Sequence, residues 1–381
     1  MDLKQTLQHL LYVNICKRIS KEHFEILKAY LDHKMIRGHS MWTIYRTAQI
    51  VSEFMQFLES RGKSVRDFEI RDVEAYYSWL LTWNSVNCLY TKASYIRPFI
   101  RWLSEYFEDE RFLELWRRIK SPKRVEKKLP IPDDDTIMAY LKAIDNPKYK
   151  ALFALLAETG LRLGEALRLS PKDFIDHGDH YEVRIMSEKS GEVRTVYVVL
   201  FYDYVKSWIN RLPKNARFVF HGRRPDKMLA RGAFGQYLRK IEKKHGLPHI
   251  WPHLLRHYNA VRLLRLGMSE KEVREIHGWK TPEMLDRYAP YLPYLKDKYL
   301  RLVGLRRAQP EERIELKPIS CLRCGHQNPP GSDFCTKCGA PLGPSAKRIS
   351  MSNIMGDLEK LKREIERLKK QQLQLLKELK L

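Results

Sequence analysis

Apolar residues recur with helical spacing from residue 15 to residue 107. In one stretch Ile44, Ala48, Val51, Met55 and Leu58 follow at intervals of four, three, four and three residues, so they share one face of a helix. Gly62 then supplies a stop. Similar stripes predict two further helices, formed around Val73, Tyr77 and Leu80 and around Ile96, Ile100, Leu103 and Phe107. We therefore expect a small helical domain at residues 15–118.

A change in composition marks the end of this domain. Residues 119–132 contain Pro122, Pro130 and Pro132 within a run of basic residues. Prolines disfavour helix, so this segment is predicted to be a basic linker. Asp133-Asp134-Asp135 then favours the start of a helix, because acidic side chains in the first turn interact with the helix dipole. A second domain is expected at residues 133–306.

The second domain is predicted to be helical with one β-hairpin. Residues 152–157 form an apolar run that ends at Thr159-Gly160, which indicates a buried helix. Alternating apolar residues predict two strands joined by the Gly-containing turn 188–192, with inward positions Tyr181, Val183, Ile185, Val196, Val198 and Leu200. Residues 201–250 look helical, apart from a basic loop at Arg223-Arg224. The fold class is mainly α with a small antiparallel β-sheet.

The last segment carries a heptad pattern. Its seam residues recur at alternating intervals of four and three: Ile354, Leu358, Leu361, Ile365, Leu368, Gln372, Leu375 and Leu379. We expect a coiled-coil helix at residues 353–381, either within a homo-oligomer or with a partner. A lone helix folding back on the protein is the alternative, because the seam spans only about four heptads.

Four of the six cysteines form two short hooks. Cys321 and Cys324 are separated by two residues, ten residues follow, and Cys335 and Cys338 repeat the spacing. A glycine after each hook permits a tight turn, and four thiolates suit a tetrahedral zinc ion. We predict a four-cysteine zinc ribbon at residues 318–342 that holds one structural zinc, over free thiols or an iron–sulfur cluster. Cys16 and Cys88 are predicted to be small buried hydrophobes.

The charge balance points to a polyanionic partner. The chain has 70 Lys+Arg against 46 Asp+Glu, a formal net charge of +24 that is spread along its length. Nucleic acid is the favoured partner; a solvated cationic surface is the alternative, and an anionic membrane lacks a basic amphipathic anchor. Basic residues between the helical stripes are candidates for phosphate contacts, namely Arg46, Lys92, Arg97 and Arg101. No apolar run approaches the ~18 residues of a membrane span and residues 1–20 lack a signal-peptide pattern, so we expect a cytoplasmic protein without membrane association.

Residues 251–288 supply an unusual set of reactive groups. Within them lie the imidazole of His253, the guanidinium of Arg256, the indole of Trp279 and the phenol of Tyr288. A phenol has an ordinary pKa of about 10 and becomes a nucleophile when cations stabilise the phenolate and a base takes its proton. Arginine holds phosphate oxygens through paired hydrogen bonds. The set predicts attack by a tyrosine on a phosphodiester.

The spacing of these residues resembles the tyrosine recombinases, the family of phage integrases and Xer-type resolvases. His253-x-x-Arg256 is followed by Gly278-Trp279, and Tyr288 comes nine residues after Trp279. Upstream, Thr159-Gly160-Leu161-Arg162 with Glu165 resembles the family's first arginine motif. Lys189 precedes Arg194 by five residues, as the hairpin lysine of the family does. The match spans about 130 residues and is more specific than any one motif.

The resemblance implies a mechanism and a set of partners. Tyr288 attacks phosphorus and joins the 3′-phosphate, Arg162 and Arg256 hold non-bridging oxygens, and Lys189 protonates the departing 5′-oxygen. His253 shuttles the tyrosine proton, and Trp279 donates its indole N–H to the phosphate. Catalysis needs no metal or nucleotide. The helical domain is a core-binding domain that clamps double-stranded DNA opposite the catalytic domain, and a homotetramer acts on paired recombination sites.

Several alternatives stay open at this point. His253 by itself would be interpreted as a core histidine, Arg162 as a surface arginine and Lys189 as an ordinary turn lysine, since Glu188 and Glu192 replace residues that the family often has there. His257 and His277 are interpreted as structural, and Tyr291, Tyr294 and Tyr299 as packing residues. Two rival functions are a DNA-binding adaptor without cleavage and a relaxase like the type IB topoisomerases. The intact residue set argues against the first, and the oligomerising tail argues against the second.

Overall fold

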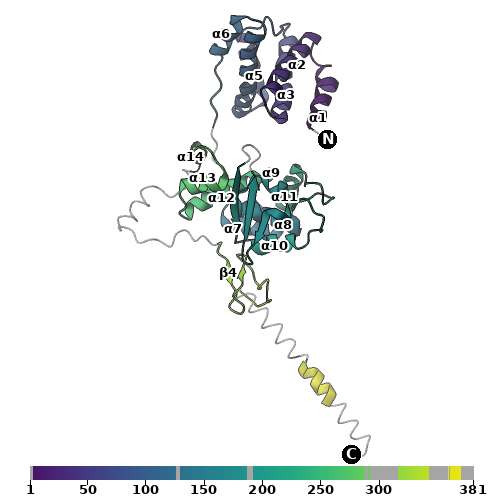
Figure 1. Cartoon of the computed structure of the whole chain (residues 1–381), viewed down its shortest axis with the longest axis vertical. Helices are drawn as coiled ribbons and strands as arrows, with labels where there is room; N and C mark the ends of the chain where they lie inside the picture. Colours follow the sequence, from purple (N-terminus) through teal and green to yellow (C-terminus); the bar gives the residue numbers. More distant parts are fainter. Residues whose placement is uncertain are drawn as a thin grey trace, which may run out of the picture. The chain divides into compact units, whose positions relative to one another are not determined.

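The chain folds as two compact units, residues 1–129 and 130–381 (Figure 1). The computed structural model describes residues 3–125, 129–186, 192–286, 288, 291, 316–342, 359 and 361–369. Each unit has its own hydrophobic core. None of the helices in these ranges is long and apolar enough to cross a bilayer.

The first unit consists entirely of helices within its described residues. It begins with α1 (Leu3–His9) and a π-helical turn (Leu10–Ile15), a segment that the sequence did not predict. The remaining helices are α2 (Lys21–Ile36), α3 (Met41–Ser60), α4 (Ile70–Trp83), α5 (Val86–Tyr106) and α6 (Glu110–Arg118). The predicted stripes are confirmed as core, because Ile44, Val51 and Leu58 of α3 are almost completely buried.

Serine caps set where three of these helices begin. The side chains of Ser20, Ser40 and Ser85 accept the backbone N–H three residues further on. Each cap satisfies one of the N–H groups that a helix start leaves without a partner. At the other end of α3, Gly62 has a positive φ of 69°, which is the stop predicted from the sequence.

The second unit is built around a buried helix, α8 (Pro147–Thr159). Every residue from Ala151 to Ala157 is buried, so the helix is apolar on all sides rather than on one stripe. The other helices described in this unit are α7 (Asp134–Ala143), α9 (Leu163–Arg168), α10 (Tyr202–Ile209), α11 (Arg231–His245), α12 (Pro252–Arg265), α13 (Glu270–His277) and α14 (Glu283–Asp286). Asp133 caps α7 by accepting the Thr136 N–H, so the predicted helix start is confirmed.

An antiparallel sheet of three strands completes the main fold of the second unit. Its order is β1 (Phe174–Asp176), β2 (Tyr181–Met186) and β3 (Val193–Val198). The register places Val183 opposite Val196, and the alternating positions Tyr181, Val183, Ile185, Val196 and Val198 are buried. The two predicted strands and their pairing are confirmed, although Leu200 follows β3 and is half-buried, and residues 187–191 of the connection lie outside the described residues. The edge strand β1 was not predicted, because three residues are too few to show a period.

Residues 316–342 pack against the rest of the second unit rather than standing apart from it. They contain the short strands β4 (Ile319–Ser320) and β5 (Gln327–Asn328). Leu316 belongs to the same core as α8. The carboxylate of Asp203 on α10 bonds both to His326 Nε2, at 3.0 Å, and to the Thr336 hydroxyl, at 2.5 Å. Beyond this segment, residues 361–369 are helical, and the rest of the predicted coiled coil lies outside the described residues apart from residue 359.

Candidate active site

Gly160, in the left-handed conformation, ends α8 and turns the chain toward Arg162. Its φ is 62°, a conformation that favours glycine. Two residues later Arg162 is the N-cap of α9. Its side chain is 48% exposed, and its Nη1 donates to Glu165 Oε1 at 2.9 Å. Arg162 is therefore accessible to a large anionic ligand while one carboxylate limits its orientation.

Glu165 links this arginine to a second one on the sheet. Its Oε2 accepts from Arg194 Nη2 at 2.8 Å and from the Arg162 backbone N–H at 2.9 Å. Burial alone would raise the pKa of the Glu165 carboxyl, but the hydrogen bond and charge of Arg194, together with Arg162, lower the pKa below its usual value. Glu165 is consequently ionised at neutral pH, and it holds both guanidinium groups.

Arg256 lies in the interior, at 1% exposure. It extends from α12, where Nη1 donates to the Gly160 carbonyl at 2.7 Å and Nη2 donates to the His277 carbonyl at 2.5 Å. The guanidinium carbon lies 5.1 Å from the centre of the Trp279 ring. Burial and then the charge of Arg162 lower the pKa of Arg256 to about 9. It therefore remains a cation at neutral pH.

Tyr288 is also buried, at 0% exposure. Its hydroxyl lies 2.6 Å from His257 Nδ1, and its ring stacks against Trp279 at a centroid distance of 5.8 Å. The two groups are close enough that a phenolate at Tyr288 would raise the pKa of Arg256. Trp279 therefore lies against both the cation and the phenol.

The structure brings together most of the residues that the sequence singled out. Arg162, Arg256, Trp279 and Tyr288 come from four segments and meet near the end of α8. Lys189 lies outside the described residues, between the end of β2 and the start of β3.

A histidine next to the proposed one contacts the tyrosine. His253 is exposed at the start of α12, where its ring meets that of His257 edge to face at 4.7 Å. A direct partner of the Tyr288 hydroxyl is His257, which sequence reasoning treated as structural. A helical spacing of four residues places these two histidines on one face of α12, and this spacing is the sequence signal that could have identified His257.

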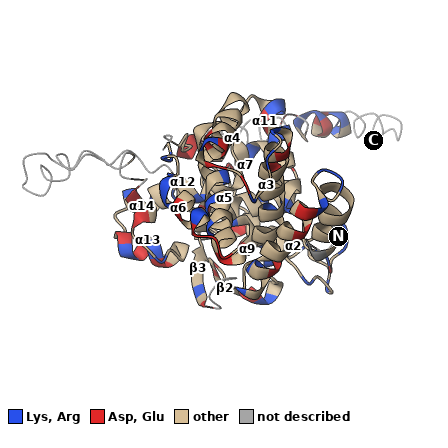
Figure 2. Ribbon diagram, turned by 90° about the horizontal axis from the view of Figure 1, so that it is seen from above, with Lys and Arg blue, Asp and Glu red and all other residues tan. Residues whose placement is uncertain are grey.

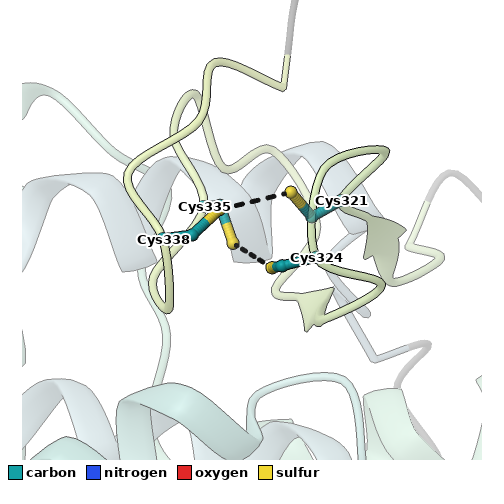
Figure 3. Close-up of side chains that lie close together, drawn as sticks. All are labelled: Cys321, Cys324, Cys335 and Cys338. Carbon is teal, nitrogen blue, oxygen red and sulfur yellow. Dashed lines mark hydrogen bonds between the residues drawn. The ribbon is translucent and has the colours of Figure 1, made fainter.

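The cysteine hooks form a compact four-sulfur centre, in which the sulfur atoms face one another (Figure 3). Sγ of Cys321 lies 3.6 Å from that of Cys338, and Sγ of Cys324 lies 3.6 Å from that of Cys335. When four thiolates bind zinc tetrahedrally with Zn–S bonds of about 2.3 Å, their sulfur atoms lie about 3.8 Å from one another. Gly325 and Gly339 have the positive φ that the knuckle turns require. The four thiolates fit a structural zinc ion.

We expect Cys335→Ser to eliminate zinc binding and to unfold residues 316–342, because a segment with so small a core depends on its metal. Zinc content per chain, measured by metal analysis, checks this, and proteolysis within 316–342 reports the unfolding. Cys16→Ser, which removes a cysteine of the first unit, is the matched control. Full zinc content in Cys335→Ser would contradict the assignment.

A mainly helical domain that gathers two arginines, a tryptophan and a tyrosine around a glycine turn has the features of an enzyme that exchanges phosphodiesters through a tyrosine. Residues 133–292 match the phage integrase family, and residues 320–342 match a zinc-ribbon domain. The second unit therefore carries a domain similar to the phage integrase family, the tyrosine recombinases, and a zinc-ribbon domain follows it.

Named relatives and solved structures agree with this assignment. Tyrosine recombinase XerC of Rickettsia canadensis is 28% identical over 258 residues, which is 62% of this chain and 81% of the relative. Tyrosine recombinase XerA of Saccharolobus solfataricus is 26% identical over 292 residues, 74% of this chain and 94% of the relative.

The fold is shared with the XerH site-specific recombinase bound to a palindromic difH substrate. That comparison has a TM-score of 0.59 at 16% identity and covers 80% of this chain and 94% of the other. A lambda integrase dimer bound to a COC′ core site has a TM-score of 0.52 at 16% identity. That comparison covers 68% of this chain and 96% of the other.

Proposed function

We propose that this chain is a site-specific DNA recombinase that cuts and rejoins DNA through a covalent 3′-phosphotyrosine. The observation that carries the proposal is the grouping of Arg162, Arg256 and Tyr288 around the end of α8. Two guanidinium groups supply fixed positive charge where the transition state gathers negative charge. A phenol beside them is the nucleophile that such a site can activate.

The bond changes follow from this arrangement. The Tyr288 oxygen forms a bond to phosphorus, the bond from phosphorus to the 5′-oxygen breaks, and the phenol proton passes to an imidazole. The contact at 2.6 Å supports His257 as the imidazole that pairs with the phenol O–H at rest, with His253 next to it as a route for the proton to solvent. Lys189 is the proposed acid for the leaving oxygen. A new 5′-hydroxyl then reverses the step and joins a different strand.

Tyr288 must move before it can attack DNA. Its ring is fully buried, whereas Arg162 is half exposed. Two Nη hydrogens of Arg256 are used by the Gly160 and His277 carbonyls, which leaves other guanidinium N–H groups for a phosphate. We infer that DNA binding is accompanied by release of Tyr288 from His257, so that the phenol and the phosphate meet between the two arginines.

The proposed partner is double-stranded DNA carrying paired sites. Basic residues occur on elements of both units, interspersed with acidic ones (Figure 2). Four cations are proposed for phosphate contacts. Arg46 bonds to Gln49 at 3.1 Å, Lys92 is paired with Glu53 at 2.5 Å and Arg97 bonds to Ser121 at 3.2 Å. Arg101 is exposed and lies over Trp116. These internal contacts leave Arg101 as the best supported of the set. The proposed substrate places the activity in the cytoplasm.

We propose the five-part organisation predicted from the sequence, in which the core-binding and catalytic domains hold DNA and the tail supports a tetramer. Leu361, Ile365 and Leu368 are 58%, 50% and 58% exposed on the helical segment 361–369. Their heptad spacing suits a seam that a second helix covers. A lambda integrase tetramer bound to a Holliday junction is among the structures with a similar fold, at a TM-score of 0.51.

The proposed function can be tested with a plasmid that carries two copies of the DNA flanking the gene. The plasmid is incubated with the protein and its products are analysed. We expect excised or inverted recombinants, because strand exchange requires two sites in one assembly. Plasmids that carry one copy are the control and should not recombine. Relaxed circles without recombinants would indicate the topoisomerase-like alternative. Binding without any cleaved product would indicate the adaptor.

A further inference from the structure

A buried pair of polar side chains lies behind the arginine site. His277 ends α13 and Asn259 lies in the middle of α12, and both are 0% exposed. His277 Nε2 lies 2.9 Å from Asn259 Oδ1. The amide nitrogen of Asn259 donates to the Glu158 carbonyl at 2.5 Å and, more weakly, to the Ala157 carbonyl at 3.3 Å. Because the amide nitrogen is the donor there, Oδ1 is the acceptor and His277 carries its proton on Nε2.

The pair joins three segments of the site at close range. Asn259 reaches the last turn of α8, just before the turn that leads to Arg162. A Cβ at Gly160 would lie 2.6 Å from both Asn259 Oδ1 and His277 Cε1. The absence of a side chain at Gly160 is therefore what lets the pair approach the end of α8. Burial, and then the charge of Arg256, hold the pKa of His277 well below its ordinary value, so the imidazole stays neutral.

The backbone of the same turn holds two arginines. The Ile276 carbonyl accepts from Arg194 Nε at 3.0 Å, and the His277 carbonyl accepts from Arg256 Nη2 at 2.5 Å. These carbonyls are among the groups that a helix C-terminus leaves without intrahelical partners. The His277 ring also stacks on Trp279 at 4.4 Å. A shift of the end of α13 would move all of these groups together.

We propose that the hydrogen bond between His277 and Asn259 is a positioning device that sets the end of α13 against the end of α8 and thereby orients Arg256 and Trp279 for the reaction. This inference rests on the proposed recombinase function. Neither side chain touches DNA. Their effect passes through the His277 carbonyl to Arg256 and through the His277 ring to Trp279.

A comparison of His277→Gln with His277→Met tests the device. The two replacements have similar length and volume, but only glutamine carries an N–H donor for Asn259 Oδ1. The readouts are the single-turnover rate of covalent adduct on a nicked duplex at saturating protein, the affinity for the same duplex, and the thermal melting temperature. A displacement of about 1 Å in a reacting group can reduce rate by about 100-fold.

We expect His277→Met to form adduct about 100-fold more slowly, with duplex affinity within threefold of wild type. His277→Gln should recover most of that rate. Equal adduct rates for the two variants would overturn the inference, since packing alone would then account for the pair. If His277→Met does not fold, Asn259→Leu gives the same comparison from the other partner, because it retains His277 and removes its acceptor. A wild-type adduct rate in Asn259→Leu would likewise overturn it.

Adduct formation by the wild-type protein is scored first. No wild-type adduct would refute the proposed function itself. Wild-type adduct together with matching rates for His277→Gln and His277→Met would refute the positioning role and leave the function standing.

Discussion

Tyr288→Phe is expected to form no covalent adduct with a nicked DNA duplex, at least about 10⁴-fold below wild type, because the attacking oxygen is gone. The phenyl ring should keep its contact with Trp279, since the ring geometry is unchanged. Loss of one hydrogen bond to His257 should change the free energy of unfolding by only about 1 kcal/mol. Denaturing gel electrophoresis of labelled DNA measures the adduct, and thermal melting measures the stability.

Tyr291→Phe is the matched control for this prediction. Tyr291 lies three residues further on, and its backbone carbonyl, which phenylalanine keeps, accepts from Arg265. The Tyr291→Phe protein should form adduct at the wild-type rate. Adduct retained in Tyr288→Phe, or lost in Tyr291→Phe alone, would show that a different phenol is the nucleophile.

Removal of either arginine is expected to slow adduct formation by about 10²- to 10³-fold, the range measured for loss of one preorganised donor to a developing oxyanion. The two variants should differ in stability. Arg162 is half exposed and bonds to Glu165, so Arg162→Ala should change the melting temperature little. Arg256→Ala removes a buried cation and leaves the Gly160 and His277 carbonyls without these donors. An unsatisfied buried carbonyl costs about 1–3 kcal/mol.

Arg184→Ala is a suitable control, because Arg184 is an exposed arginine of β2 that pairs with Glu182. It should keep both adduct formation and stability. Single-turnover rates at saturating protein separate the chemical step from DNA affinity. An Arg162→Ala protein that reacts at the wild-type rate would exclude Arg162 from the transition state. An Arg256→Ala protein as stable as wild type would contradict the buried contacts described above.

The residue pattern predicted many of the elements that surround the site. The α3 stripe, the Asp133 start of α7, the Gly160 end of α8 and the hairpin of β2 and β3 all appear where periodicity and turn residues placed them. The π-helical turn Leu10–Ile15 and the short strand β1 were missed. The first departs from the usual helical period, and the second is too short to display a period.

The sequence alone indicated the order and spacing of the arginines, Trp279, Tyr288 and the cysteine hooks, because these patterns are set by short stretches of chain. It could not reveal that Arg256 is buried, that His257 meets the Tyr288 hydroxyl, or that His277 bonds to Asn259. Those contacts join α8, α12 and α13 across gaps of up to about a hundred residues. Such pairings depend on how helices pack in three dimensions, and neither helical period nor local spacing records them.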